Sequence, residues 1–326
     1  MARHGLSRSL PFGRELMTTL LISHDSALNH ATPRGHPERA DRLRAVMAVL
    51  EDEQFSTLAR EEAPEAELEA IVQVHPMRYV EAIRDAVPAD GELARIDGDT
   101  SLSSGSWEPI LRAAGGAVLA VDEVMVGHAA NAFVAMRPPG HHAETATAMG
   151  FCFLNNAAIA ARHAQKHYGA GRVAIVDFDV HHGNGSQEIF WSDASVLYCS
   201  THEMPLYPGS GAPTERGEHN NIVNAPLSSG SGGKEFRETV ASIILPRLDE
   251  FRPDLVVVSA GFDAHMRDPL ASLNLDETDF AWVTDQLMQV ADRHSEGRLV
   301  SVLEGGYDLQ GLSQSAAAHV KTLMRA

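Results

Sequence analysis

Short apolar runs alternate with longer amphipathic segments along almost the whole chain. The apolar runs predict six strands, over residues 19–23, 132–136, 172–179, 195–200, 254–260 and 298–303. Several of them, such as VAIVDFDV and DLVVVSAG, are apolar and β-branched at consecutive positions rather than at every second one. Strands of this kind are typical of parallel sheets that are buried on both faces.

The amphipathic segments between these runs predict seven helices, over residues 37–50, 76–86, 107–126, 155–168, 234–251, 277–294 and 312–324. A strand followed by a helix, repeated many times, indicates an α/β fold with a parallel sheet and helices on both of its faces. Because no internal repeat and no long linker divides the chain, we predict one domain over residues 17–326. Residues 1–16 lack apolar periodicity, and we expect them to form a flexible extension.

The composition of the chain argues against nucleic acid and membrane partners. The chain carries 44 acidic and 26 basic residues, for a formal net charge of −18. A surface of that sign repels phosphate backbones, so we expect no nucleic acid partner. No apolar run reaches the roughly 18 residues of a membrane-spanning helix, so we expect no membrane partner. The two cysteines, Cys152 and Cys199, cannot form a disulfide framework and suit a reducing, cytoplasmic location.

Polar residues directly follow five of the predicted strands. In a parallel α/β sheet, ligand sites lie outside the carboxyl ends of the strands. The segments at these ends are residues 137–142, 177–184, 200–202, 261–265 and 304–307, and each contains His, Asp or Tyr. These segments are therefore the candidates for a functional site.

Two of the segments carry candidate metal ligands. Strand alternation sends Asp177, Asp179 and His181 in one direction if the extended geometry continues. Asp263 follows another buried strand and would add a further carboxylate. Two carboxylates and one imidazole leave an open position for water, as catalytic zinc sites require. Each motif alone is equally well explained by helix capping and a surface histidine, but their joint presence favours a metal.

Other segments carry candidate acid–base groups. His141 and His142 follow a rigid PPG turn, and a histidine beside an activated water can act as general base and then as general acid. Asp177 and Asn184 are available to fix the tautomers of these rings. Tyr307 follows two glycines, and its hydroxyl could donate to an oxyanion. Taken singly, a histidine pair is more often surface decoration or a metal ligand, and such a tyrosine is more often packing.

Seven segments, in order, resemble the histone deacetylase superfamily, in particular its class II-like bacterial members and acetylpolyamine amidohydrolases. They are HPERADRL, RPPGHHA, MGFCFLNNAAIAA, VAIVDFDVHHGNG, YPGSG, SAGFDAH and LEGGY, and the resemblance spans about residues 18–324. It implies the arginase/deacetylase fold, which is an eight-stranded, mostly parallel sheet flanked by helices on both faces. It also implies a metal-dependent deacetylase, a hydrolase acting on linear amides.

The resemblance assigns roles to particular residues. The implied metal ligands are Asp179, His181 and Asp263, holding one Zn²⁺ per chain, with Fe²⁺ as the alternative ion. The implied catalytic residues are His142 as general base and acid, His141, Asp177, Asn184, and Tyr307 as oxyanion donor. A structural K⁺ would be held by Asp177, Asp179, His181, Ser200 and Thr201, largely through backbone oxygens. An acyl-lysine tunnel would be lined by Phe151, Tyr207, Leu270, Gly150 and Gly305, with Tyr207 replacing a more usual Phe.

The implied substrates are acylated lysines in peptides or proteins, or acylated small amines. Polyamine specialists of the superfamily often carry a Glu where this chain has Leu270, and a long insertion where residues 91–106 are compact. Both differences favour acyl-lysine over acetylpolyamines. An arginase-like ureohydrolase is less well supported, because Gly183 and Gly261 stand where a second metal would need Asp. A non-catalytic acyl-lysine binder would not need His142. The sequence is compatible with a homo-oligomer.

Overall fold

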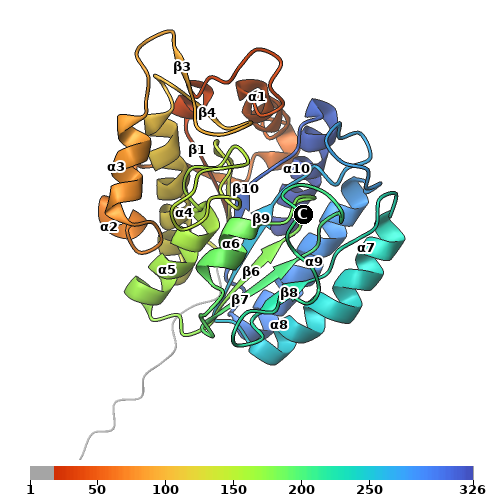
Figure 1. Ribbon diagram of the computed structural model, residues 1–326. Helices are drawn as coiled ribbons and strands as arrows, with labels where there is room; N and C mark the ends of the chain where they lie inside the picture. The colour runs from red at the N-terminus through yellow and green to blue at the C-terminus, as the bar shows by residue number, and fades with distance from the viewer. Residues whose placement is uncertain (1–17, 326) are drawn as a thin grey trace, which may run out of the picture.

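The computed structural model describes residues 18–325, and the extension predicted over residues 1–16 lies outside them. Eight strands form one sheet in the order β2-β1-β5-β10-β9-β6-β7-β8, and every neighbouring pair is parallel (Figure 1). The strands are β1 (Thr19–Ser23), β2 (Ala59–Glu62), β5 (Asn131–Val134), β6 (Val173–Asp177), β7 (Val196–Ser200), β8 (Ile222–Asn224), β9 (Leu255–Ala260) and β10 (Leu299–Leu303). The eight-stranded parallel sheet implied by the sequence resemblance is confirmed.

Strands β6, β9 and β10 lie side by side in the middle of this sheet, and all their residues are buried. Asp177 pairs with Ser259 between β6 and β9, and Leu303 pairs with Ala260 between β9 and β10. Because parallel strands point the same way, their carboxyl ends meet at one edge of the sheet. The loops that leave these three strands therefore share one location.

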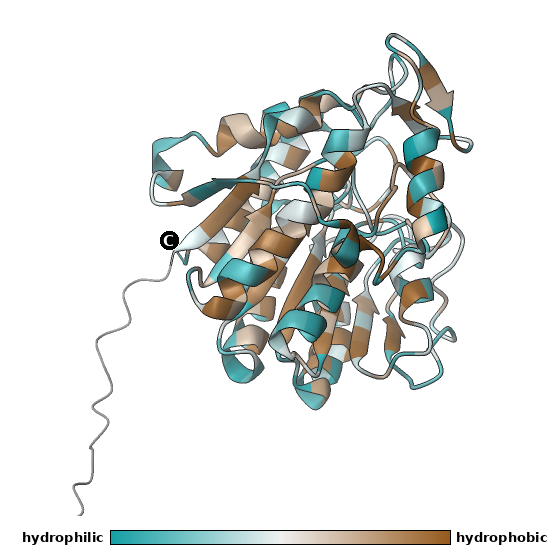
Figure 2. Ribbon diagram, turned by 90° about the vertical axis from the view of Figure 1, so that its left-hand side faces the viewer, coloured by the Kyte–Doolittle hydropathy of each residue, from teal (hydrophilic) through white to brown (hydrophobic). Residues whose placement is uncertain are grey.

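Helices cover both faces of the sheet and give the molecule three layers (Figure 1). On one face α4 packs against α5, and on the other α10 packs between α1 and α9. The helices are α1 (Ala40–Val49), α2 (Leu68–Ile71), α3 (Met77–Asp85), α4 (Trp107–Val126), α5 (Asn156–Tyr168), α6 (Asn184–Ile189), α7 (Gly233–Thr239), α8 (Leu245–Phe251), α9 (Glu277–His294) and α10 (Leu309–Leu323). Figure 2 shows mainly hydrophobic strands in the centre and, around them, helices that carry both hydrophilic and hydrophobic residues. Within residues 18–325, no helix combines the length and the apolar character needed to cross a membrane.

All six predicted strands and all seven predicted helical regions are present, with ends shifted by a few residues. The strand predicted over 172–179 ends at Asp177, where the chain leaves the sheet. The helix predicted over 234–251 is divided into α7 and α8 by a π-helical stretch, Val240–Ile244. The prediction lacks β2, β8, α2, α6 and a hairpin of β3 (Leu93–Arg95) and β4 (Ser101–Ser103), because these elements are short and most have no apolar run.

Candidate metal centre and active site

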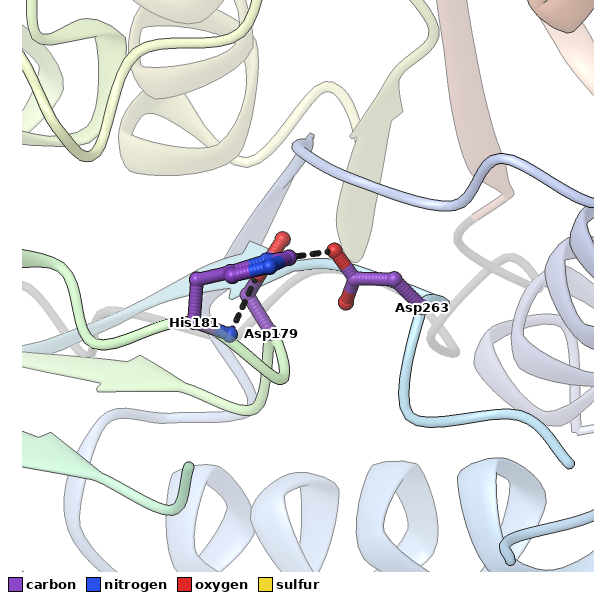
Figure 3. A group of neighbouring side chains, drawn as sticks. All are labelled: Asp179, His181 and Asp263. Atoms are coloured by element: carbon purple, nitrogen blue, oxygen red, sulfur yellow. Dashed lines mark hydrogen bonds and ion pairs between the residues drawn. The ribbon is translucent and has the colours of Figure 1, made fainter. Parts of the chain in front are cut away.

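The loops after β6 and β9 bring three ligand-type side chains together, as Figure 3 shows. Asp179 and His181 follow β6, and Asp263 follows β9. His181 Nδ1 lies 3.1 Å from Asp263 Oδ2 and 3.3 Å from Asp179 Oδ1, and the three ligand atoms all lie within 4.8 Å of one another. We call these three residues the ligand cluster. Among the residues that the structure describes, no other group of three or more His, Cys, Asp or Glu side chains is arranged in this way.

The ligand cluster has the donor set and the charge of a divalent metal site. Asp179 and Asp263 are 1% and 0% exposed. Burial and the neighbouring charge of Asp179 raise the pKa of Asp263 to about 7. Burial alone would lower the pKa of His181, but its bonds to the two carboxylates raise it to about 10, and a metal ion bound at Nδ1 would take the place of that proton. Two buried carboxylates this close together need a cation, and one imidazole with two carboxylate oxygens suits Zn²⁺ with an open fourth position. The residues therefore fit one metal ion.

Backbone groups hold both carboxylates in place. The Gly305 N–H donates to Asp179 Oδ2 at 2.8 Å, and the Val180 N–H donates to Asp263 Oδ1 at 2.8 Å. Gly261 passes so close to Asp179 that a Cβ at this position would lie 2.0 Å from Oδ2. A glycine is therefore required at position 261, which cannot supply a further carboxylate.

His141 lies behind the ligand cluster in a buried ion pair. Its Nδ1 donates to Asp177 Oδ2 at 3.0 Å, and the Tyr198 hydroxyl donates to the same oxygen at 3.0 Å. Burial alone would lower the pKa of His141, but Asp177 and Asp179 raise it well above its usual value. The two carboxylates therefore favour the protonated form of His141, which is less suited than a neutral ring to accept a proton.

The pKa of His142 is shifted in the opposite direction to that of His141. The Nδ1 atom of His142 lies 2.9 Å from Asn184 Oδ1. Burial and the nearby charge of His141 lower the pKa of His142 well below its usual value, so the ring is neutral near pH 7. Because an amide oxygen only accepts hydrogen bonds, Nδ1 carries the hydrogen and Nε2 keeps the lone pair. A neutral imidazole with an available Nε2 can act as a general base.

Tyr307 lies in the turn after β10. Its ring packs edge-on against Phe151, with centroids 5.8 Å apart, and the Arg42 guanidinium lies 4.9 Å from its centroid. The Tyr307 backbone N–H donates to Asp268 Oδ2 at 2.7 Å. Burial raises the pKa of the Tyr307 hydroxyl well above its usual value. The hydroxyl therefore keeps its hydrogen and can serve as a hydrogen-bond donor.

A pocket of about 400 Å³ lies over these groups, with His142, His181 and Tyr307 in its wall. Four of the five predicted tunnel residues also line it, namely Gly150, Phe151, Tyr207 and Leu270. The fifth, Gly305, is not among the lining residues. It lies beneath the pocket, where a Cβ would meet the carboxylates of the ligand cluster.

The wall around Phe151 has an unusual backbone. Phe151 has φ of 69° and Gly150 has φ of 56°, so two consecutive residues are left-handed. A Cβ on Gly150 would lie 2.4 Å from Cδ2 of His142, which explains the glycine. A left-handed phenylalanine is costly and typical of functional sites, and here it turns the ring toward Tyr307.

The pocket contains residues that sequence reasoning missed, chiefly His36, Asp99 and Leu206. His36 lies with one ring nitrogen 3.0 Å from the Glu38 carbonyl oxygen and the other 2.9 Å from the Asp99 carbonyl oxygen. The segments that carry these residues have no periodicity. The only sequence signals were the HPER motif around His36 and the DGD turn around Asp99.

Comparison with known proteins decides the family. Residues 36–323 match the family described as the histone deacetylase domain. The chain belongs to the histone deacetylase family. It is 40% identical over 301 residues to a probable deacetylase of Archaeoglobus fulgidus, covering 90% of this chain and 83% of the relative. It is 39% identical over 279 residues to a histone deacetylase-like amidohydrolase of Pseudomonas aeruginosa, covering 84% of this chain and 73% of the relative.

A crystal structure of the HDA15 HD domain superposes on this histone deacetylase family chain with a TM-score of 0.90. The two are 36% identical, and the match covers 95% of this chain and 89% of that one. The chain is accordingly a hydrolase of the deacetylase and amidohydrolase kind, and its family and fold agree with the sequence resemblance.

In this histone deacetylase family chain, the residues predicted to hold K⁺ lie at the ends of β6 and β7. Asp177 pairs with Ser200 across the two strands, and the Thr201 N–H donates to the Asp177 carbonyl oxygen at 3.0 Å. The Asp179 carboxylate accepts from the His181 N–H at 2.9 Å in the loop that follows. The five residues are therefore neighbours, and K⁺ binding stays a prediction.

A second buried charge cluster lies next to the Tyr307 turn. Arg137 donates to both Glu38 oxygens at 2.5 Å, and Arg42 donates to Glu38 Oε1 at 3.1 Å. Arg42 also donates to the carbonyl oxygens of Gly306, at 2.6 Å, and of Glu304. Burial alone would raise the pKa of Glu38, but the two arginines lower it to about 2. This cluster ties the start of α1 to the turn after β10.

Proposed function

We propose that this chain is a zinc-dependent amidohydrolase that removes acetyl or other short acyl groups from lysine side chains. The supporting observation is that His181 of the ligand cluster shares one pocket with His142 and Tyr307. Aromatic rings flank this pocket, with Tyr207 5.2 Å from His142 and Phe151 5.8 Å from Tyr307 between ring centroids. A pocket of this kind suits an extended apolar chain that ends in an amide.

Different residues would bind the metal, transfer protons and stabilise the oxyanion during amide hydrolysis. Zn²⁺ held by the ligand cluster would lower the pKa of water to about 7 and polarise the amide carbonyl. His142, with its Nδ1 hydrogen held by Asn184, would take a proton from the attacking water through Nε2. Tyr307 would donate its hydroxyl hydrogen to the developing oxyanion. His142 would then pass the proton to the leaving amine, which releases a short carboxylic acid and a free lysine.

Two further features complete the proposal. K⁺ would bind backbone oxygens of the neighbouring loops at Asp177, Asp179, His181, Ser200 and Thr201. The activity would be cytoplasmic, because both cysteines are buried free thiols, which suits a reducing compartment.

Two pocket residues bear on the choice between acyl-lysine and acetylpolyamine. Leu270 offers no charge to the distal ammonium of a polyamine, which favours acyl-lysine. Asp99 lines the same pocket, however, and its carboxylate supports acetylpolyamine hydrolysis as a second candidate function. An ammonium needs the negative charge of Asp99, whereas a peptide N–H needs only an oxygen acceptor.

A kcat/KM panel of acetyl-lysine peptides, longer acyl-lysines and acetylated polyamines tests the substrate. We expect acetyl-lysine peptides to be preferred, and Leu270→Glu to shift the preference toward polyamines. Asp99→Asn keeps an oxygen acceptor, so we expect it to cost peptides at most about tenfold. If the unmodified protein hydrolyses acetylpolyamines far better than any acetyl-lysine peptide, the polyamine function replaces the proposed one.

A two-metal ureohydrolase is a poorer match to the same site. A Cβ on Gly183 would lie 2.3 Å from Asp177 Oδ2, and a Cβ on Gly261 would lie 2.0 Å from Asp179 Oδ2. Neither position has room for a further carboxylate ligand. A single metal ion therefore remains the proposal.

A further inference from the structure

A carboxylate outside the pocket controls the orientation of Asn184. The Asn184 Nδ2 donates to Glu144 Oε1 at 2.9 Å and lies 3.3 Å from Met149 Sδ. An ionised carboxylate and a thioether can accept hydrogen bonds but cannot donate them. Both neighbours therefore require the nitrogen end of the Asn184 amide on their side.

That orientation decides which nitrogen of His142 carries the hydrogen. With Nδ2 directed at Glu144, Asn184 presents Oδ1 to His142 Nδ1 at 2.9 Å. If the amide were reversed, an NH₂ group would face Nδ1, and the hydrogen would have to move to Nε2. An aspartate at position 184 would not have this ambiguity, because both of its oxygens accept.

We propose that Glu144 is a positioning residue that sets the reactive tautomer of His142 through Asn184. The inference rests on the proposed function, in which His142 Nε2 must be free to take a proton. Glu144 touches neither the pocket over the ligand cluster nor the ligand cluster itself, and it acts only through the amide. Its backbone is held by a bond from the Glu144 N–H to the Thr147 carbonyl oxygen at 3.0 Å.

The surroundings of Glu144 provide a matched control. Glu144 is half-buried and lines a surface cavity of about 390 Å³ together with Glu188 and Trp191. Glu188 accepts from the Thr145 N–H and hydroxyl at 2.9 and 2.7 Å and makes no bond to Asn184. The two glutamates therefore share charge and line the same cavity, Glu188 being the more exposed, and they differ in their contact with the amide.

Charge reversal at the two positions tests the proposal. Glu144→Lys replaces an acceptor by a donor, which would draw Asn184 Oδ1 away from His142. We expect kcat to fall by at least about 10²-fold, since a wrong histidine tautomer costs up to about 10⁴-fold. KM and zinc content should change little. Glu188→Lys makes the same change of net charge and should keep kcat within about threefold.

A second substitution should rescue the first. In Asn184→Asp, both side-chain oxygens accept, so a lysine at position 144 can pair with one oxygen while the other still accepts from His142. Asn184→Asp alone sets two acceptors against each other at the Glu144 contact, so adding Glu144→Lys should raise kcat in this background or leave it within about threefold. A merely structural role of Glu144 would predict a loss in both backgrounds, and such a loss would overturn the proposal.

The tautomer itself can be read without any substrate. The ¹⁵N chemical shifts of His142, in full-length protein labelled at histidine, distinguish hydrogen on Nδ1 from hydrogen on Nε2. We expect Nδ1–H in the unmodified protein and in Glu188→Lys, and Nε2–H in Glu144→Lys. An unchanged tautomer in Glu144→Lys would overturn the proposal even if activity fell. This readout stays valid if no acyl substrate is hydrolysed, so failure of the proposed function remains distinguishable.

Discussion

The proposed function divides the side chains around the pocket into metal ligands and proton carriers, and substitution should separate the two. His142→Ala should nearly abolish kcat with zinc content intact, because His142 is bonded to Asn184 rather than to the ligand cluster. Tyr307→Phe keeps the ring and removes one donor, and should lower kcat by about 10²–10³-fold. Asp263→Ala should instead lose the zinc. Kinetics with metal analysis check all three, and full activity of Tyr307→Phe on every acyl substrate would end its assigned role.

Glu38 contributes to the stability of the fold through its buried ion pairs with Arg137 and Arg42. Its pKa is about 2 in the folded chain, against an ordinary value of 4.5. A lowered folded-state pKa stabilises the fold above the ordinary value, and this contribution is lost as the pH falls from about 4.5 toward 2. Glu38→Gln should lower the free energy of unfolding by about 3–5 kcal/mol at neutral pH, because Arg137 and Arg42 stay buried without a carboxylate.

Urea denaturation between neutral pH and about pH 3 measures this effect. The difference in free energy of unfolding between Glu38→Gln and the unmodified protein should become smaller as the pH drops below about 4.5. Glu51 provides the control, since its side chain is 68% exposed and pairs with Arg60 at the surface. Glu51→Gln should change stability by less than about 1 kcal/mol. A difference for Glu38→Gln that is independent of pH would contradict the assigned ion pair.

At the scale of elements, the end of β9 leaves no room for a side chain beside the ligand cluster. A Cβ on Gly261 would lie 2.0 Å from Asp179 Oδ2, so Gly261→Ala must displace a ligand. We expect the variant to lose most of its zinc and its activity, as measured by metal analysis after dialysis. In Gly171→Ala the nearest atom to the Cβ would be an Asp254 oxygen at 3.5 Å, and both properties should be kept. Normal zinc content in Gly261→Ala would disprove the close approach.

Elements with a strong apolar pattern were predictable, and the others were not. β6, β9 and β10 are buried throughout, so their sequences show continuous apolar runs. β2 reads AREE and is largely exposed at the edge of the sheet, which leaves no such run. The three-residue strands β3, β4 and β8 are too short for any period to show.

In the candidate site too, residues that follow apolar strands were predictable and residues in loops were not. Asp179, His181 and Asp263 directly follow buried parallel strands, whose carboxyl ends must meet, so their proximity could be inferred. Asp99 and Glu144 come from loops, and their neighbours depend on how distant loops fold over the sheet. Asn184 was predictable as a partner of the histidines, but the acceptor that orients its amide was not.

Metal content is a property of the whole molecule. We predict one divalent ion per chain, with K⁺ counted separately. Removing the ion with a chelator should lower the melting temperature, because the buried carboxylates of Asp179 and Asp263 would lose the cation that offsets their repulsion. Adding Zn²⁺ should restore it. Two catalytic ions about 3–4 Å apart would contradict the single-metal site.

If the single-metal site is as proposed, the position of β9 also sets the time at which the ion can be bound. Asp263 lies 82 residues beyond His181 in the sequence, and β9 occupies the place between β6 and β10. A growing chain on the ribosome exposes Asp179 and His181 long before β9 has been made. Two ligands cannot complete the site, so metal uptake must wait until β9 has inserted into the sheet. Truncated or misfolded chains would therefore not bind zinc. Only chains in which β9 has joined the sheet would carry the metal.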